Sequence, residues 1–394
     1  MAINWSQQLL DELALWFVVQ HSVSAYTTLL KHFGTARQAL QASSVDWQAL
    51  ALHHAHTKKL TEWQQNPALA QRFEQAIHAL NHAQDQVISL KDSSYPRQLK
   101  QIADPPPFLF VRGNLHALNQ PQIAIVGSRK PSQTGQQIAE RFAHTLAEQG
   151  FFIASGLAYG IDAHAHRGAL AAGSGQTIAV MGTGVNLCYP AAHQSLYWQI
   201  VEAGGAIVSE FMPGTPAREY HFPRRNRIVS GLSLGILVVE AALKSGSLIT
   251  AQAALEQNRQ VFAIPGHIYN EQSRGCHQLI REGAILVDEP QHIVDEMDLP
   301  RRWQQQACTG TQAAPVALDT ASPSTVSLPP ASPLITIPEH LQLVYQALDW
   351  VGLSLDDLVE TVKIDVATLT SHLMEMELMG IAVQQGGLYQ RCRQ

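Results

Sequence analysis

Between Gln122 and Ile264, short apolar segments alternate with helical segments, which limits the fold more than any other feature of the sequence. Apolar strands without a polar face are typical of a parallel sheet that helices cover on both sides. We therefore expect an α/β fold with a Rossmann-like, mostly parallel sheet, in which ligands bind at the carboxyl ends of the strands. The predicted strands are Gln122–Val126, Phe151–Ala154, Thr177–Met181, Ala206–Val208, Leu234–Val239 and Val261–Ile264, with helices such as Gly135–Gln149 and Ile161–Ala172 between them.

The segments before and after this alternation predict the domain organisation. Residues 1–85 show helical periodicity in Leu9–Val19 and Ser24–Leu40, with Gly34 expected to end one helix and Thr35 to cap the next. This segment reads as a helical N-terminal domain, and its few Lys and Arg residues favour a plain bundle over a DNA-binding hairpin. Residues 86–302 form the expected core, and 303–338 form a proline-rich linker whose only charged residue is Asp319.

Residues 339–394 have the order of a winged-helix domain. Helices are expected at Glu339–Trp350, Leu355–Val362 and Val366–Met379, followed by two short strands, Ile381–Val383 and Leu388–Gln390. No Lys or Arg lies between Lys363 and Arg391, and the candidate recognition helix carries Glu375 and Glu377. We expect a protein-contact or regulatory module here, since DNA binding usually needs positive charge.

Charge and cysteine content restrict where and how the chain could bind nucleic acid. The formal net charge is −6, so a nucleic-acid site must be a local basic patch. Four widely spaced cysteines predict reduced thiols, neither a disulfide framework nor a zinc knuckle. The N-terminus has no signal-peptide pattern, and no stretch has the length and apolarity of a membrane span. We expect a cytoplasmic protein.

Glycine-containing turns follow several predicted strands, where backbone N–H groups could bind anions. The turn residues we single out as candidates are Gly127, Ser128, Arg129, Ser155, Gly156, Lys244, Ser245 and Gly246. The turn at Arg129 has no Walker A spacing, and a solvated arginine on a plain strand–helix turn is the alternative. The Ser155 turn lacks the full G-x-G-x-x-G pattern of dinucleotide binding, and we expect no cofactor. Asp162, His164 and His166 do not have zinc spacing for a helix, so we expect no metal.

An arginine-rich segment, Ala217–Leu232, adds positive charge to these turns. Arginine forks bind phosphates, and flat rings stack on unpaired bases, which points to a single nucleic-acid strand. The candidate contacts from this segment are Phe222, Arg224, Arg225, Asn226 and Arg227. We expect Arg129, Arg227 and Lys244 to converge on one groove.

Two other function classes remain open from the residues alone. Related-looking α/β folds with a glutamate at a strand end hydrolyse nucleotide phosphoribosyl bonds, with Glu240 and Arg129 as candidate catalysts here. A structural Glu240, paired with Lys244 or a nearby arginine, is the simpler interpretation, and we expect no enzyme activity. A nucleotide-sensing scaffold is the third possibility.

The motifs together resemble the bacterial DNA-processing protein A (DprA/Smf) family. The similarity extends unbroken from about Asp92 to Val287 and is carried by G-S-R, S-G-L-A-x-G-I-D-A, F-P-R-R-N-R-I-V-S-G-L, K-S-G-S-L-I-T-A and F-A-I-P-G. The resemblance implies single-stranded DNA binding without marked sequence preference, loading of the recombinase RecA during natural transformation, and a homodimer formed through the Rossmann-like core. It also implies the domain order that we derive above.

By position, three motifs match that family's DNA-facing segments. They comprise Gly127, Ser128 and Arg129, then Phe222, Arg224, Asn226 and Arg227, and finally Lys244, Ser245 and Gly246. The resemblance makes Phe222 the base-stacking residue. Three departures are Tyr159 in place of a common Arg, His277 in place of Asn, and Glu219 just before Phe222. The sequence does not give the preferred DNA length, the RecA contact surface, the roles of the terminal domains or whether the host is transformable.

Overall fold

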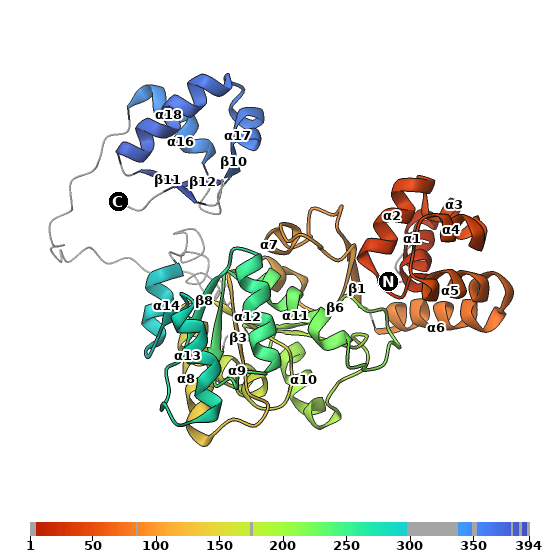
Figure 1. Ribbon diagram of the computed structural model, residues 1–394, viewed down its shortest axis with the longest axis horizontal. Helices are drawn as coiled ribbons and strands as arrows, with labels where there is room; N and C mark the ends of the chain where they lie inside the picture. The colour runs from red at the N-terminus through yellow and green to blue at the C-terminus, as the bar shows by residue number, and fades with distance from the viewer. Residues whose placement is uncertain are drawn as a thin grey trace, which may run out of the picture. The chain divides into compact units, whose positions relative to one another are not determined.

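A computed structural model describes residues 5–83, 85–173, 176–297, 338–348, 353–379, 381–385 and 388–391. These residues fall into two compact units, one before and one after the segment 298–337 (Figure 1). The predicted linker lies almost wholly outside the described residues. No described helix has both the length and the apolarity needed to cross a membrane.

The first unit is built on a nine-stranded sheet of order β1-β2-β6-β5-β4-β3-β7-β8-β9. Strands β3 to β9 are parallel, while β2 pairs antiparallel with both β1 and β6 at one edge. The α/β fold class with a mostly parallel sheet is therefore confirmed. The strands are β1 (Gln86–Ser89), β2 (Phe108–Gly113), β3 (Gln122–Gly127), β4 (Phe152–Ser155), β5 (Thr177–Val180), β6 (Ala206–Ser209), β7 (Gly235–Val239), β8 (Gln260–Ala263) and β9 (Ile285–Leu286).

Helices cover both faces of this sheet because alternate residues of each strand point to opposite sides. Ile123 and Ile125 of β3 pack against α8 and α9, whereas Ala124 and Val126 face the side of α11 and α12. Strands β5, β6 and β7 are buried at every position, as parallel strands between helices must be. The core helices are α7 (Arg97–Lys100), α8 (Gln133–Glu148), α9 (Ile161–Ala171), α10 (Gln194–Glu202), α11 (His221–Leu232), α12 (Gly246–Glu256), α13 (Arg274–Arg281) and α14 (Pro290–Met297).

The strand order reverses at β3. After β3 the chain adds β4, β5 and β6 on one side, and then α11 returns it to place β7 on the other side of β3. Helix α8, which follows β3, and α12, which follows β7, cover opposite faces of the sheet. The carboxyl ends of β3 and β7 therefore border a crevice at the topological switch point, the usual ligand position in such sheets.

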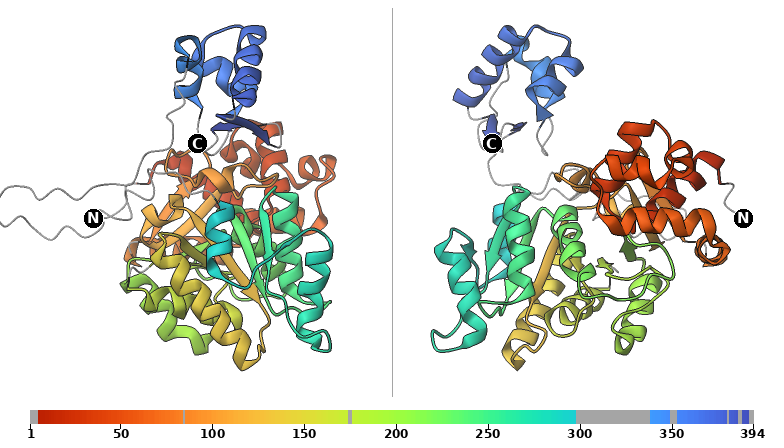
Figure 2. Two further views of the ribbon diagram at one scale, coloured as in Figure 1. Left: turned by 90° about the vertical axis from the view of Figure 1, so that its left-hand side faces the viewer. Right: turned by 45° about the vertical axis from the view of Figure 1, so that its right-hand side comes forward.

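Six helices precede the sheet and pack beside its antiparallel edge (Figure 2). Phe108 and Phe110 of β2 enter the same apolar cluster as Leu13 and Trp16 of α1. As predicted, Gly34 ends α2 with a φ of 78°, and the Thr35 hydroxyl accepts a hydrogen bond from the Gln38 N–H to cap α3. The helices are α1 (Gln7–Val18), α2 (Val23–Phe33), α3 (Ala36–Gln41), α4 (Ser44–Ala49), α5 (His54–Gln65) and α6 (Pro67–Ala83).

The second unit has its own apolar cluster and a three-stranded antiparallel sheet of order β10-β12-β11. Helices α16 (Gln342–Ala347), α17 (Leu355–Val362) and α18 (Val366–Leu378) pack with β11 (Ala382–Gln385) and β12 (Leu388–Arg391), which confirms the predicted winged helix. The additional strand β10 (Leu353–Ser354) was not predicted, because two residues are too short for a periodic signal.

Candidate functional site

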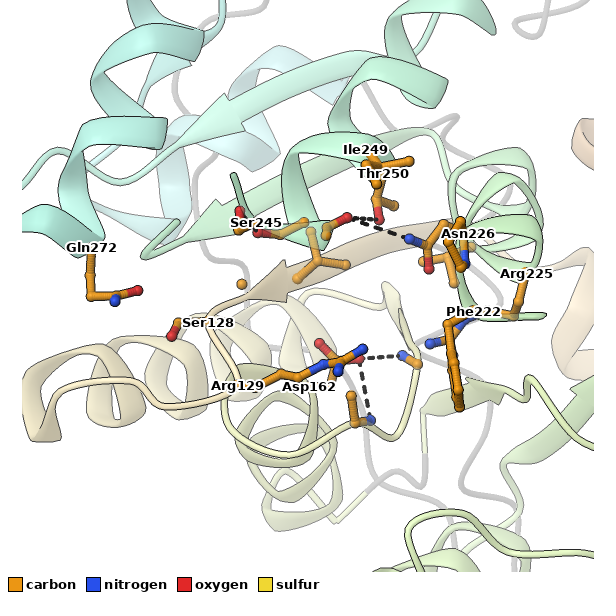
Figure 3. Close-up of a pocket in the computed structure, with 18 residues that line it drawn as sticks. Ser128, Arg129, Asp162, Phe222, Arg225, Asn226, Ser245, Ile249, Thr250 and Gln272 are labelled. Carbon is orange, nitrogen blue, oxygen red and sulfur yellow. Dashed lines mark hydrogen bonds between the residues drawn. The ribbon is translucent and has the colours of Figure 1, made fainter. Parts of the chain in front are cut away.

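A cavity of about 350 Å³ lies at the switch point of the sheet. We call it the switch-point cavity. Figure 3 shows Arg129, which follows β3, and Ser245, which precedes α12, projecting from different elements toward this space. Of the sequence-predicted candidates, the cavity lining includes Gly127, Ser128, Arg129, Gly156, Phe222, Arg225, Asn226, Ser245 and Gly246.

Close backbone packing shapes the turn that carries Arg129. A Cβ at Gly127 would overlap the carbonyl oxygen of Val239, so only glycine fits between β3 and β7. The Ser128 N–H donates to the Glu240 carbonyl at 2.7 Å, and the Ser128 carbonyl accepts from Ile161 at the start of α9 at 3.0 Å. The turn after β3 is thus fixed to the elements on both sides, which fixes the starting point of the Arg129 side chain.

The Arg129 guanidinium is the exposed cation of the cavity. Its Cζ lies 5.9 Å from the centre of the Phe222 ring, a cation–π distance, and no carboxylate among the described residues forms an ion pair with it. The Phe222 ring also lies 5.4 Å from the Tyr189 ring at an angle of 40°. An exposed guanidinium and a partly exposed pair of rings therefore meet at one side of the cavity, with the buried Asp162 carboxylate close enough to interact with the guanidinium charge.

The first turn of α12 borders the cavity opposite this cation. Ser245, Gly246 and Ser247 line it, and the hydroxyls of the two serines lie 2.8 Å apart. The N–H groups at the start of a helix have no intrahelical acceptor and carry partial positive charge. Asn226 of α11 donates to the Gly246 carbonyl at 3.4 Å, which links the two helices (Figure 3). This turn can therefore bind an anion facing Arg129.

Arg225 and Asp162 form the buried floor of the cavity. Arg225 is 4% exposed and donates to the Val180 carbonyl, and burial lowers its pKa to about 10. Burial raises the pKa of Asp162, whose carboxylate accepts N–H bonds from Gly156 at 3.0 Å and Ala158 at 3.4 Å. Arg225 is thus held as a structural cation below the turns, rather than as the exposed phosphate contact that its place in the arginine-rich segment suggests.

The predicted convergence of Arg129, Arg227 and Lys244 is wrong for Arg227. The arginine-rich segment folds as α11, and Arg224 and Arg227, three residues apart on one face, both bind the fully buried Glu210. Their distances to its Oε2 are 3.0 and 2.6 Å, and Arg227 also pairs with Asp104. Helical periodicity directs Phe222 and Asn226 to the cavity and these two arginines away from it, toward Ser24 and Thr28 of α2.

Two further expectations are revised by the positions of the side chains. Ser155 is fully buried, and its hydroxyl donates to the Ile125 carbonyl, so it connects β4 to β3 and does not line the cavity. Glu240 binds the Ser132 hydroxyl and N–H at the start of α8, not Lys244. Lys244 is exposed directly before Ser245, and none of the described carboxylates pairs with it.

Sequence reasoning did not single out Tyr189, Thr250 or Gln272. Thr250 and Gln272 line the cavity, and Tyr189 packs on Phe222. The sequence shows Tyr189 in a glycine-containing turn after β5, but only the fold brings its ring onto Phe222. No three His, Cys, Asp or Glu side chains of the described segments are grouped so that they could hold a metal ion. His164 instead contacts Glu140, and His166 contacts Thr177.

Comparison with known proteins gives consistent matches over most of the chain. A sequence model of DNA recombination-mediator protein A matches residues 86–298, and one of the DprA winged helix domain matches residues 328–387. Protein Smf of Escherichia coli is 43% identical over 333 residues, which cover 82% of this chain and 84% of that protein. DNA processing protein DprA of Streptococcus pneumoniae is 46% identical over 210 residues, 53% of this chain and 73% of that protein.

The fold is also similar to that of a solved structure from this group of proteins. The X-ray structure of DNA processing protein A from Streptococcus pneumoniae has a TM-score of 0.62 and 35% identity to this chain. The match covers 76% of this chain and 100% of that one.

Proposed function

The chain belongs to the DNA recombination-mediator protein A family, and from this premise we propose that it binds single-stranded DNA at the switch-point cavity. The observation that carries the proposal is the exposed Arg129 guanidinium over the Phe222 ring, facing the first turn of α12. Positive charge beside an accessible ring suits an unpaired strand, whose phosphates and base faces are both exposed.

In this proposal the phosphate backbone lies between Arg129 and the α12 turn at Ser245 and Gly246. Exposed Lys244, at the start of that turn, adds charge at the margin, and a base stacks on Phe222. These contacts address phosphates and ring faces, which all nucleotides share, so binding has little sequence preference. The proposed contacts do not include side chains that already bind other parts of the protein. These are Arg224 and Arg227, which bind Glu210, and Arg225 and Ser155, which donate to backbone carbonyls.

We also propose that the site binds its ligand without transforming it. Glu240, the candidate catalytic carboxylate, accepts the hydroxyl and N–H of Ser132, the residue that caps α8. Its φ of 54° is strained for a residue other than glycine, and this strain places its carbonyl to accept the Ser128 N–H. These contacts support a structural role, and both the wild-type protein and Glu240→Gln should leave bound oligonucleotides and nucleotides chemically unchanged.

The family suggests that the bound strand is passed to the recombinase RecA during natural transformation or recombination. The support is the family's description as a recombination mediator and the match to a DNA processing protein. In a test, the protein should accelerate assembly of RecA filaments on single-stranded DNA, and the Arg129→Ala variant should do so less. An equal acceleration by both proteins would argue against delivery from this cavity.

We further propose a homodimer formed through the Rossmann-like core. Exposed apolar side chains follow the neighbouring strands β7 and β8. They are Leu243 and Ile249 after β7, and Ile268 and Tyr269 after β8. Clustered exposed apolar groups commonly mark protein contacts. Sedimentation equilibrium should give a dimer for the wild-type chain and a smaller species for Ile268→Glu.

A salt-titrated binding assay tests the central proposal. Single-stranded oligonucleotides of mixed sequence should bind more tightly than the corresponding duplexes, and affinity should fall steeply with salt. Equal affinity for duplex and single strand would contradict the proposal, as would binding that does not depend on salt.

A further inference from the structure

A second cavity, of about 360 Å³, lies between the N-terminal helices and the loops that follow β5 and β6. We call it the N-terminal cavity. Its lining includes Lys59 of α5, Arg72 of α6 and Arg218 of the segment before α11. Nothing in the proposed function above uses this cavity.

The charge of the N-terminal cavity has one sign. Among the described residues that line it are three cations and no carboxylate, although the chain as a whole has a net charge of −6. Arg72 is exposed and pairs with no carboxylate in the described part of the chain, and Arg218 donates to the Tyr220 hydroxyl at 2.7 Å. Lys59 pairs with Glu62 at 2.8 Å, but both side chains remain partly exposed and the pair is therefore weak. Such a cavity favours an anionic ligand.

The two cavities adjoin each other along the chain. Tyr220 and His221 line the N-terminal cavity, and Phe222 and Pro223, the next two residues, line the switch-point cavity. Exposed rings lie at this junction. Tyr189 is 48% exposed and packs on Phe222, and Tyr220 is exposed beside Arg218.

Hydrogen bonds fix the loops that carry these rings relative to each other. The Asn186 side chain accepts from the Gly214 N–H at 2.8 Å, and the Gly184 N–H donates to the Thr215 carbonyl at 3.0 Å. The loop after β5, which holds Tyr189, and the loop after β6, which leads to Tyr220, are thus joined. A ligand that crosses the junction meets a preformed surface.

We propose that a DNA strand bound in the switch-point cavity continues across Phe222, Tyr189 and Tyr220 into the N-terminal cavity, where Lys59, Arg72 and Arg218 bind its phosphates. This inference rests on the proposed function and adds the N-terminal helices to the DNA-binding surface. Alternating cations and exposed rings favour a nucleic-acid strand over an acidic peptide, because only the strand has bases to stack on Tyr189 and Tyr220.

The test removes the two cations that the N-terminal helices contribute. The double variant Lys59→Ala/Arg72→Ala is compared with Lys31→Ala/Lys58→Ala, which removes the same charge from exposed positions outside both cavities. Binding is measured against salt with oligonucleotides of about 5 and about 16 nucleotides, which bracket common single-strand site sizes. Thermal melting confirms that both variants are folded.

We expect the Lys59/Arg72 variant to lose several-fold in affinity for the longer oligonucleotide, with a salt slope lower by ~1.4, since each single-strand phosphate contact contributes ~0.7. Its affinity for the shorter oligonucleotide should not change, and the control variant should match the wild type with both. An unchanged slope with the longer oligonucleotide overturns the inference and favours an acidic protein as ligand of the N-terminal cavity. Failure of the wild-type protein to bind either oligonucleotide overturns the proposed function itself.

Discussion

Two guanidinium sites of this molecule differ in what surrounds them. Around Glu210, Arg224 and Arg227 are 24% and 11% exposed and share one buried carboxylate, with Asp104 as a further partner of Arg227. At the switch-point cavity, Arg129 is exposed, has no carboxylate partner among the described residues and lies over a ring. The first site uses arginine to join parts of the fold, whereas the second leaves its charge available to a ligand.

The Glu210 site lies where the N-terminal helices meet the sheet. The Trp16 indole N–H donates to the Glu210 carbonyl at 3.0 Å, and Arg224 lies over the rings of Trp16 and Phe211. His21 accepts from the Met212 N–H at 3.2 Å in the same region. The comparison teaches that the number of arginines in a segment does not measure its binding charge, because buried carboxylates elsewhere in the sequence can neutralise them.

The largest effect that would sharpen this comparison is expected from Glu210→Ala. Removing the buried carboxylate leaves Arg224 and Arg227 without their shared partner, so the free energy of unfolding should fall by about 3–5 kcal/mol. Urea denaturation measures this loss. The folded fraction should bind single-stranded DNA with wild-type affinity. Exposed Glu219→Ala is the control and should change neither quantity. A DNA-binding defect with normal stability would reverse the roles that we assign to the two sites.

Acidification should weaken the Glu210 region through His21. Burial, followed by the charge of nearby Arg224, lowers the pKa of His21 well below 6.5. The folded protein therefore favours the neutral ring, and its contribution is complete above pH 6.5, the pKa of an unfolded histidine. As pH falls below 6.5, the unfolded chain takes up the proton first, and stability falls by up to ~1.4 kcal/mol per pH unit for this group.

His166 should also lower the stability of the protein on acidification, so its contribution must be separated from that of His21. Burial lowers its pKa to about 3, so its contribution is lost between pH 6.5 and 3. Unfolding free energies of the wild type and His21→Gln, measured at several pH values, separate the two histidines. The variant should have a shallower pH dependence below pH 6.5. Parallel curves would show that His21 is not the titrating group.

Phe222 tests whether the switch-point cavity binds bases. Phe222→Ala should cost ~1–3 kcal/mol of single-strand binding, the range for loss of one base–aromatic stack. Phe222→Leu is the matched control, since it keeps apolar volume but has no flat face, and it should lose binding as well. Fluorescence anisotropy gives the affinities. If Leu restores full affinity, the ring serves packing against Tyr189 rather than stacking.

Alanine substitutions of Arg129 and Arg227 should have opposite effects, one on DNA binding and the other on stability. Arg129→Ala should lower the slope of log affinity against log salt by ~0.7, the value for one single-strand phosphate contact, and leave urea denaturation unchanged. Arg227→Ala should do the opposite, because its guanidinium lies between Glu210 and Asp104. If Arg227→Ala instead reduces the salt slope and leaves stability normal, Arg227 contacts the DNA after all.

The sheet and its turns could be predicted from the sequence, whereas the directions of the arginines could not. β3, β5, β6 and β7 are buried on both faces and so appear as uninterrupted apolar runs, and glycine turns mark their ends. The helix α11 was missed because Pro223 and three arginines obscure its periodicity, although proline is tolerated in a first helical turn. Without that helix, the opposite directions of Phe222 and Arg227 could not be derived.

The partner of these arginines was hidden for a different reason. Glu210 directly follows β6, 14 residues before Arg224, and nothing local to either residue predicts their contact. Tertiary pairing across elements depends on the strand order, which places the end of β6 beside the N-terminal helices. The exposed Tyr189 was missed similarly, since only the fold shows that its loop approaches α11.

The smallest effect is expected from removing the winged helix, a surface whose charge is opposite to that of the switch-point cavity. Helices α17 and α18 contain Asp356, Asp357, Glu360, Glu375 and Glu377 and no Lys or Arg. A helix that contacts phosphates needs positive charge, since carboxylates at that surface repel the DNA backbone.

A chain that ends at Arg302 should therefore keep its single-strand affinity to within about twofold, and its salt slope should be unchanged. The full-length double variant Glu375→Gln/Glu377→Gln is the companion measurement. If α18 approached the backbone, removing these two negative charges would raise affinity and steepen the slope, so we expect no change in either. A tenfold loss on truncation, or tighter binding by the double variant, would show that the second unit contributes to the DNA surface despite its charge. An unchanged affinity in both would confine the binding charge to the cations of the first unit, where the arrangement of carboxylates decides which of them remain available.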